Sequence, residues 1–118
     1  MANSKPREIL NELMGGMKEV HQTNRDQMMG FRGFMESVMK PGALDTKTKE
    51  LISVGIAAYN RCEYCIVMHV YKALEAGATG EEIMEAAMTA VTFGGGASMA
   101  YTTTLLKDSI KEFENDFE

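Results

Sequence analysis

The chain has 118 residues, of which 45% are hydrophobic and 25% charged, and its net charge is −5. This composition is typical of one small globular domain and argues against a disordered chain. The acidic balance excludes a surface built for nucleic acid, because binding to phosphates requires a basic patch.

Two helices are expected in the first third of the chain. Apolar residues spaced three and four apart mark a helix over about 9–20, and Ser4 is a candidate N-cap. The same spacing marks a second helix over about 28–39, which Pro41 and Gly42 should end.

The middle of the chain predicts a helical hairpin. Asp45 can cap a third helix, whose segment 51–59 is apolar on every side and is therefore expected to be buried. A short break at Asn60 and Arg61 then leads into a fourth helix, which should end near Gly77.

Thr79 and Glu82 have the spacing of a capping box, which predicts a fifth helix over about 80–93. After the three glycines at 94–96, a sixth helix is expected over about 97–113, and the acidic tail beyond it is expected to fray. No alternating pattern indicates a strand. We therefore predict an all-α fold of about six helices in a single domain spanning 1–118.

No segment indicates export or membrane insertion. The N-terminus lacks the apolar core of a signal peptide, because charge appears by Lys5. The run 86–106 is uncharged and long enough to cross a bilayer, but threonines and the three glycines interrupt it, which indicates two helical pieces. We expect a cytoplasmic protein with no membrane partner.

In the cytoplasm thiols stay reduced, so a close cysteine pair is expected to be catalytic or metal-binding rather than a structural disulfide.

The most specific feature is a cluster of cysteine and histidine at the start of the fourth helix. Cys62 and Cys65 are the two cysteines of the chain, and His69 is one of its two histidines. Positions 0, 3 and 7 of a helix share one face, so both sulfurs and the imidazole can meet. The positive end of the helix dipole favours a thiolate, and an imidazole can accept the thiol proton. These features describe an activated dithiol.

Glu50 is the third predicted element of this site. Reflecting the chain about the break at 60–61 places Glu50 level with residue 71, within about half a turn of His69. A carboxylate there would fix the imidazole tautomer and carry a proton onward, giving a relay Glu50–His69–Cys65. Tyr59 and Tyr64 are candidates for the walls of the site.

Glu50, followed after eleven residues by Cys62-x-x-Cys65-x-x-x-His69, resembles the alkylhydroperoxidase D and carboxymuconolactone decarboxylase-like family. The resemblance covers roughly residues 30–110 and includes the D-x-K-x-K-E-L segment that begins at Asp45. It implies an all-α helical bundle that acts as a thiol-dependent peroxidase or disulfide reductase without a cofactor. The decarboxylase branch lacks the cysteine pair, so lactone chemistry is not implied.

Carried over to this chain, the resemblance implies that Cys65 attacks the peroxide and Cys62 resolves the sulfenic acid as a disulfide. Glu50 and His69 would relay protons, and an external thiol donor, such as a lipoyl group or a thioredoxin-like protein, would supply electrons. One departure is Tyr64, which stands where the alkylhydroperoxidase D pattern has a second histidine. Many small members of the family are trimers or hexamers, so the resemblance also implies a homo-trimer or homo-hexamer.

Three other interpretations of the cysteine pair stay open. The two cysteines can be small buried hydrophobic residues of the core. With His69 they can supply three ligands of a zinc site, although no second cluster offers a fourth. The chain can also be a non-enzymatic redox sensor, or an oligomeric module whose cysteines regulate assembly.

Overall fold

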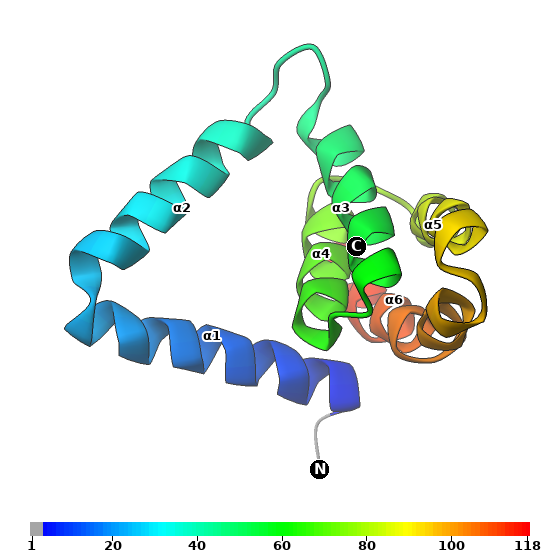
Figure 1. Ribbon diagram of the computed structural model, residues 1–118, viewed down its shortest axis with the longest axis horizontal. Coiled ribbons are helices and arrows are strands. Elements are labelled where there is room, and N and C mark those ends of the chain that lie inside the picture. Colours follow the sequence, from blue (N-terminus) through cyan, green and yellow to red (C-terminus); the bar gives the residue numbers. More distant parts are fainter. Residues whose placement is uncertain (1–3) are drawn as a thin grey trace.

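The computed structural model describes residues 4–118, and this part of the chain contains helices and no strand (Figure 1). In chain order the elements are α1 (Lys5–Thr23), α2 (Arg25–Met39), α3 (Thr46–Asn60), α4 (Glu63–Glu75), α5 (Gly80–Tyr101), a π-helical turn (Thr102–Leu106), α6 (Lys107–Phe113) and a 3₁₀ turn (Glu114–Phe117). The predicted all-α class is confirmed.

The helices form a packed body and a projecting arm. Helices α3 and α4 lie side by side at the centre of Figure 1, with α5 and α6 on one side of them. On the other side α1 runs away from the body and α2 returns at an angle. The body supplies most of the core, whereas α1 buries only Pro6 and Leu10 and α2 buries no residue.

Three of the predicted helix starts have the expected caps. The side chain of Ser4 accepts a hydrogen bond from the backbone of Arg7, and Asp45 accepts one from Thr48 at 2.7 Å. Thr79 and Glu82 exchange the two bonds of a capping box. Each cap satisfies backbone N–H groups that lack a partner at the first turn, which is why such short patterns locate helix starts.

The turn between α3 and α4 is as short as the sequence suggests. Arg61 closes α3 in the left-handed conformation, with φ 55°, and Cys62 already caps α4. Such a tight connection forces the two helices to pack against each other as a hairpin. This hairpin brings residues of α3 next to residues of α4.

The three glycines at 94–96 break the helix, as predicted, although helical structure resumes at once. Gly95 has φ 63° and ψ −146°, a conformation that is essentially restricted to glycine. A Cβ atom added at Gly94 would collide with the hydroxyl of Ser98. The chain continues through the last turn of α5 and the π-helical turn into α6.

One prediction about packing was wrong for the single chain. The apolar segment of α3 was expected to be buried, but only one side of the helix faces the body, through Val54, Ala57 and Ala58. Ile52, Ile56 and Tyr59 are exposed. Hydrophobic residues on every side of a helix do not reveal which side its own chain covers.

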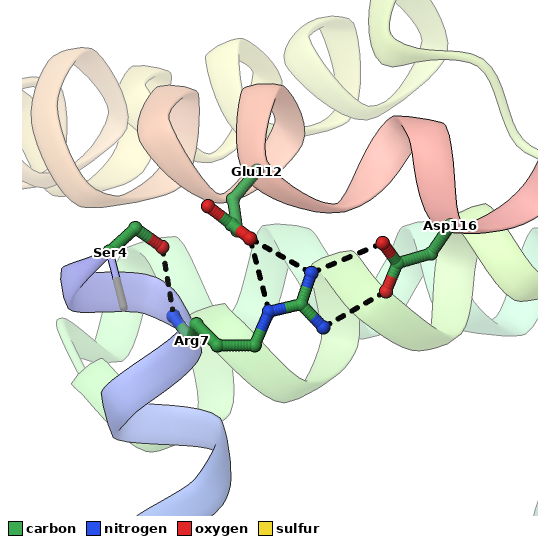
Figure 2. Close-up of polar contacts among 4 residues, drawn as sticks. All are labelled: Ser4, Arg7, Glu112 and Asp116. Atoms are coloured by element: carbon green, nitrogen blue, oxygen red, sulfur yellow. Dashed lines mark hydrogen bonds and ion pairs between the residues drawn. The ribbon is translucent and has the colours of Figure 1, made fainter. Parts of the chain in front are cut away.

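The acidic tail is ordered, which contradicts the expected fraying. Arg7 of α1 donates hydrogen bonds to Glu112 and Asp116 at 2.8–3.1 Å (Figure 2). Its guanidinium also lies over the ring of Phe113. The Ser4 hydroxyl and the Arg7 guanidinium lower the pKa of Glu112. Arg7 also lowers the pKa of Asp116. These contacts join the first helix to the last across the whole chain.

Among residues 4–118, no helix combines the length and the apolar character that a membrane span requires.

Candidate functional site

The two cysteines lie at the N-terminus of α4. Cys62 is the N-cap residue, and its Sγ accepts a hydrogen bond from the backbone N–H of Cys65 at 3.2 Å. The two residues form a disulfide across 5.2 Å between their Cα atoms, and both are half-buried. The predicted cysteine pair is therefore in contact, at a helix end whose dipole and N–H groups favour a thiolate.

Glu50 and His69 form a pair across the hairpin, in which the carboxylate is buried and the imidazole half-buried. Oε1 of Glu50, on α3, lies 2.8 Å from Nδ1 of His69, on α4. Glu50 is only 6% exposed, although it carries a carboxylate. A carboxylate only accepts hydrogen bonds, so Nδ1 of His69 is the donor in this contact, and Nε2 is the nitrogen that would accept a proton from another group. The contact expected from the register of the hairpin is present.

His69 and the two cysteines belong to one helix, α4. His69 follows Cys65 by four residues within α4, so the imidazole lies one helical turn after the sulfur and on the same side. The hairpin supplies the carboxylate behind the imidazole, and the start of α4 supplies the sulfurs. This arrangement can hold a thiolate, accept a proton from a thiol and stabilise the resulting imidazolium.

The two tyrosines proposed as walls have other surroundings. Tyr64, which lies between the cysteines in sequence, donates a hydrogen bond to Oε1 of Glu12 on α1, and this bond raises the pKa of Tyr64. Tyr59 lines a groove between α3 and α5 together with Ile56 and Phe93. Neither contact joins a tyrosine to the disulfide or to the buried pair.

The contacts from α1 were not anticipated from the sequence. Besides Glu12, Lys5 of α1 lies 3.7 Å from Glu63, so both residues between the cysteines contact α1. No local pattern could have shown this, because the partners lie about fifty residues or more apart in the chain.

The zinc alternative requires a cluster of ligands around one point. Within the described part of the chain, no three histidine, cysteine or acidic side chains are grouped closely enough to hold a metal ion.

Comparisons with known proteins place these features in a family. The model of the carboxymuconolactone decarboxylase family matches residues 26–108. A crystal structure of a carboxymuconolactone decarboxylase family protein from Legionella pneumophila superimposes with a TM-score of 0.89 and 32% identity, over 95% of this chain and 99% of that one. A Thermotoga maritima protein of the same family, for which a role in the antioxidative response has been suggested, gives a TM-score of 0.65 and 26% identity. That match covers 87% of this chain and 97% of the other.

Two curated sequences are also similar. An uncharacterized protein of the cox locus of Paracoccus denitrificans is 41% identical over 76 residues, which are 64% of this chain and 68% of that protein. The alkyl hydroperoxide reductase AhpD of Corynebacterium aurimucosum is 43% identical over 51 residues, which are 43% of this chain but only 28% of that protein.

Proposed function

Because the chain belongs to the carboxymuconolactone decarboxylase family and carries a cysteine pair, we propose that it is a thiol-dependent oxidoreductase that reduces peroxides or partner disulfides. Cys62 and Cys65 would cycle between dithiol and disulfide, and Glu50 with His69 would relay protons. The proposal needs no organic cofactor and no metal.

The observation that carries the proposal is the contact between the buried carboxylate of Glu50 and His69, which follows Cys65 by one helical turn. A carboxylate that is 6% exposed loses most of its hydration, which is unfavourable unless a partner compensates it. Here the partner is the imidazole of His69, which follows Cys65 by one helical turn within α4 and is proposed to take the thiol proton. A core that used the cysteines only as small hydrophobic residues would gain nothing from this pair.

The proposed cycle balances in three steps. The Cys65 thiolate attacks one oxygen of ROOH, the O–O bond breaks, and the alkoxide takes a proton from the relay, which gives Cys65–SOH and ROH. The Cys62 thiol then attacks the sulfenic sulfur, and water leaves as the disulfide forms. Two thiols of an external donor reduce this disulfide and are themselves oxidised to a disulfide.

The choice between the cysteines depends on two opposing effects. The helix end and the N–H of Cys65 stabilise a thiolate at Cys62. His69 lies one turn from Cys65 and can remove its proton during attack, which the helix dipole cannot do. We therefore assign the attack on peroxide to Cys65 and resolution to Cys62, as the family resemblance implies.

The names of two relatives support the reduction of peroxides as the reaction. One similar curated protein is an alkyl hydroperoxide reductase, and one similar structure has a suggested antioxidative role. We propose that a lipoyl group or a thioredoxin-like protein donates the electrons. We also propose that the protein acts in the cytoplasm.

The test is a peroxide assay with separated cysteine roles. Cys62→Ser should react once with peroxide and accumulate a sulfenic acid that dimedone traps at Cys65. Cys65→Ser should be inert to peroxide. A sulfenic acid trapped at Cys62 in Cys65→Ser would reverse the assigned roles.

Turnover distinguishes the enzyme from a redox sensor. The wild-type protein should consume many equivalents of peroxide when dihydrolipoamide or reduced thioredoxin is supplied, because the donor regenerates the dithiol. A single equivalent consumed per chain with every dithiol donor would indicate a sensor. Stoichiometric zinc in protein purified without added metal would overturn the redox cycle.

A further inference from the structure

Two adjoining cavities lie along the arm that α1 and α2 form. The first has a volume of about 360 Å³ and is lined from both helices, with His21 of α1 and Met35 of α2 among its residues. We call it the elbow cavity. The second, of about 480 Å³, continues along α1 to Tyr64 of α4, and we call it the cysteine-side cavity. Met17 and Met28 line both, so the two cavities meet at these side chains.

The cysteine-side cavity has an apolar wall. Leu13, Val20 and the two shared methionines form most of it. Its polar side chains are Glu12 and Tyr64, and these two hydrogen-bond to each other, so neither requires a polar group from a ligand. Methionine side chains are flexible and adapt to the shape of what they contact. Such a wall suits an unbranched aliphatic chain.

The elbow cavity adds positive charge at the other end. Lys18 and His21 line it from α1 and Arg32 lines it from α2, whereas none of the described residues that line it is acidic. The chain as a whole carries a net charge of −5, so three basic side chains around one cavity are a local exception. Arg32 pairs only loosely with Glu36, at 3.7 Å and with both side chains largely exposed. Basic groups at this position favour an anion such as a carboxylate.

The spacing of the two cavities relates the charge to the cysteines. Lys18 lines the elbow cavity and Glu12 lines the cysteine-side cavity, and six residues of helix correspond to about 9 Å along α1. Figure 1 shows α1 running from its junction with α2 to the start of α4, where the two helices are in contact. That start carries Cys62 and Cys65, which flank Tyr64 in the sequence. A ligand with its charge at the elbow therefore extends its chain toward the cysteines.

We propose that the two cavities together bind a fatty-acid hydroperoxide, with its carboxylate at Lys18, His21 and Arg32 and its chain directed toward the cysteines. This assignment rests on the peroxide reduction proposed above and names the class of its substrate. The Cys65 thiolate takes the outer oxygen, the O–O bond breaks, and the inner oxygen takes a proton and leaves with the chain as a hydroxy fatty acid. Cys62 then displaces water as the disulfide forms, and the external dithiol reduces this disulfide.

Binding is tested with oleic acid, which carries the carboxylate and the chain but cannot oxidise a thiol. Isothermal titration calorimetry compares wild type with Lys18→Gln/Arg32→Gln, which should bind oleate about tenfold more weakly because two charge-assisted contacts are lost. Both side chains are exposed, so the fold should persist, and circular dichroism checks this. Lys107→Gln/Lys111→Gln is the matched control, since it removes the same two charges from α6, away from both cavities, and should leave the affinity unchanged.

The uncharged ester and a wall variant separate the contribution of the chain from that of the charge. Methyl oleate should bind wild type and Lys18→Gln/Arg32→Gln equally, because it has no carboxylate. Val20→Gln places a polar group in the apolar wall at a side chain that is 46% exposed, and it should weaken the binding of oleate and of methyl oleate by a similar factor.

Kinetics with two peroxides connect the site to the reaction. Single-turnover reactions of the reduced protein compare linoleic acid hydroperoxide with tert-butyl hydroperoxide, which has neither the charge nor the long chain. The ratio of their rate constants should fall about tenfold in Lys18→Gln/Arg32→Gln and stay the same in the α6 control.

The outcomes distinguish the site from the proposed function. The same ratio in wild type and Lys18→Gln/Arg32→Gln, or an oleate affinity that does not depend on these two charges, would overturn the fatty-acid site and leave peroxide reduction standing. Charge-dependent binding of oleate by a protein that reacts with neither peroxide would retain the acyl-chain site and overturn peroxide reduction.

Discussion

Glu50→Gln tests whether the buried carboxylate assists the reaction of Cys65. Glutamine has the same shape, and its amide oxygen can still accept the Nδ1–H of His69 across the 2.8 Å contact. The imidazole should therefore keep its orientation, and the free energy of unfolding should change little. What disappears is the negative charge that stabilises the imidazolium when His69 takes the thiol proton.

The size of the effect follows from the role of the carboxylate in proton transfer. Glutamine keeps the hydrogen bond, so what is lost is the charge, and a positioned acid–base group contributes about 10²–10⁴-fold to such a step. Because Glu50 acts through His69, we expect the lower end of this range, about 10²-fold, which corresponds to about 2.7 kcal/mol at about 1.36 kcal/mol for each tenfold change in rate. Substituting His69 by alanine should slow the same step by a similar factor or more.

The assay is a single-turnover reaction of the reduced protein with hydrogen peroxide in a stopped-flow instrument. The second-order rate constant for disulfide formation is compared among wild type, Glu50→Gln and Glu112→Gln. Glu112→Gln removes the same charge at the Arg7 contact, remote in sequence from the cysteines, and should leave the rate unchanged. A Glu50→Gln rate within about threefold of the wild-type rate, in a protein with unchanged helicity, would refute the relay.

Two further predictions concern ion pairs and hydrogen bonds of α1. Folding lowers the pKa of Glu112 and of Asp116. Their contacts with Arg7 therefore stabilise the fold above the pKa values of the unfolded chain, which are near 4. This stabilisation is lost as the pH falls through the lowered pKa values of the folded protein. Arg7→Gln should therefore reduce the free energy of unfolding by about 1 kcal/mol at pH 7 and by much less at pH 3, as measured by urea denaturation. Glu12→Gln should lower the pKa of Tyr64 toward its usual value, because the hydrogen bond to Glu12 favours the neutral phenol; ultraviolet titration of tyrosinate measures this.

Each of these two predictions has a control and a contrary result. Arg32→Gln removes an exposed pair with Glu36 inside α2 and should leave unfolding unchanged at both pH values. A loss of stability in Arg7→Gln that is the same at pH 3 and pH 7 would point to packing on Phe113 rather than charge. For Tyr64, a titration curve identical in wild type and Glu12→Gln would contradict the assigned hydrogen bond.

The sequence could predict features that depend on neighbouring residues. The caps at Ser4, Asp45 and Thr79 involve partners three residues away, so a short pattern contains the whole interaction. The Glu50–His69 contact is long-range, yet it followed from counting, because the tight turn fixes the register of α3 against α4.

Features that depend on distant packing could not be obtained in this way. The tail is ordered because Arg7 reaches across more than a hundred positions to Glu112 and Asp116. The hydroxyl of Tyr64 has its partner, Glu12, on α1, 52 positions away in the chain, so no local pattern indicates this hydrogen bond. The exposure of Ile56 depends on which surfaces belong to one chain, which hydrophobic periodicity does not encode.

The break in α5 also limits how the sequence of this protein can diverge over evolution. At Gly95 the backbone conformation penalises every other residue, whereas at Gly94 the obstacle is the side chain of Ser98, its Cβ as well as its hydroxyl, so the two glycines are constrained for independent reasons. A Cβ atom added at Gly96 would meet nothing within 4 Å, so this position should vary freely. In descendants of this chain, substitution should accumulate at the third glycine, and an alanine at 94 should survive selection only where position 98 has itself become glycine.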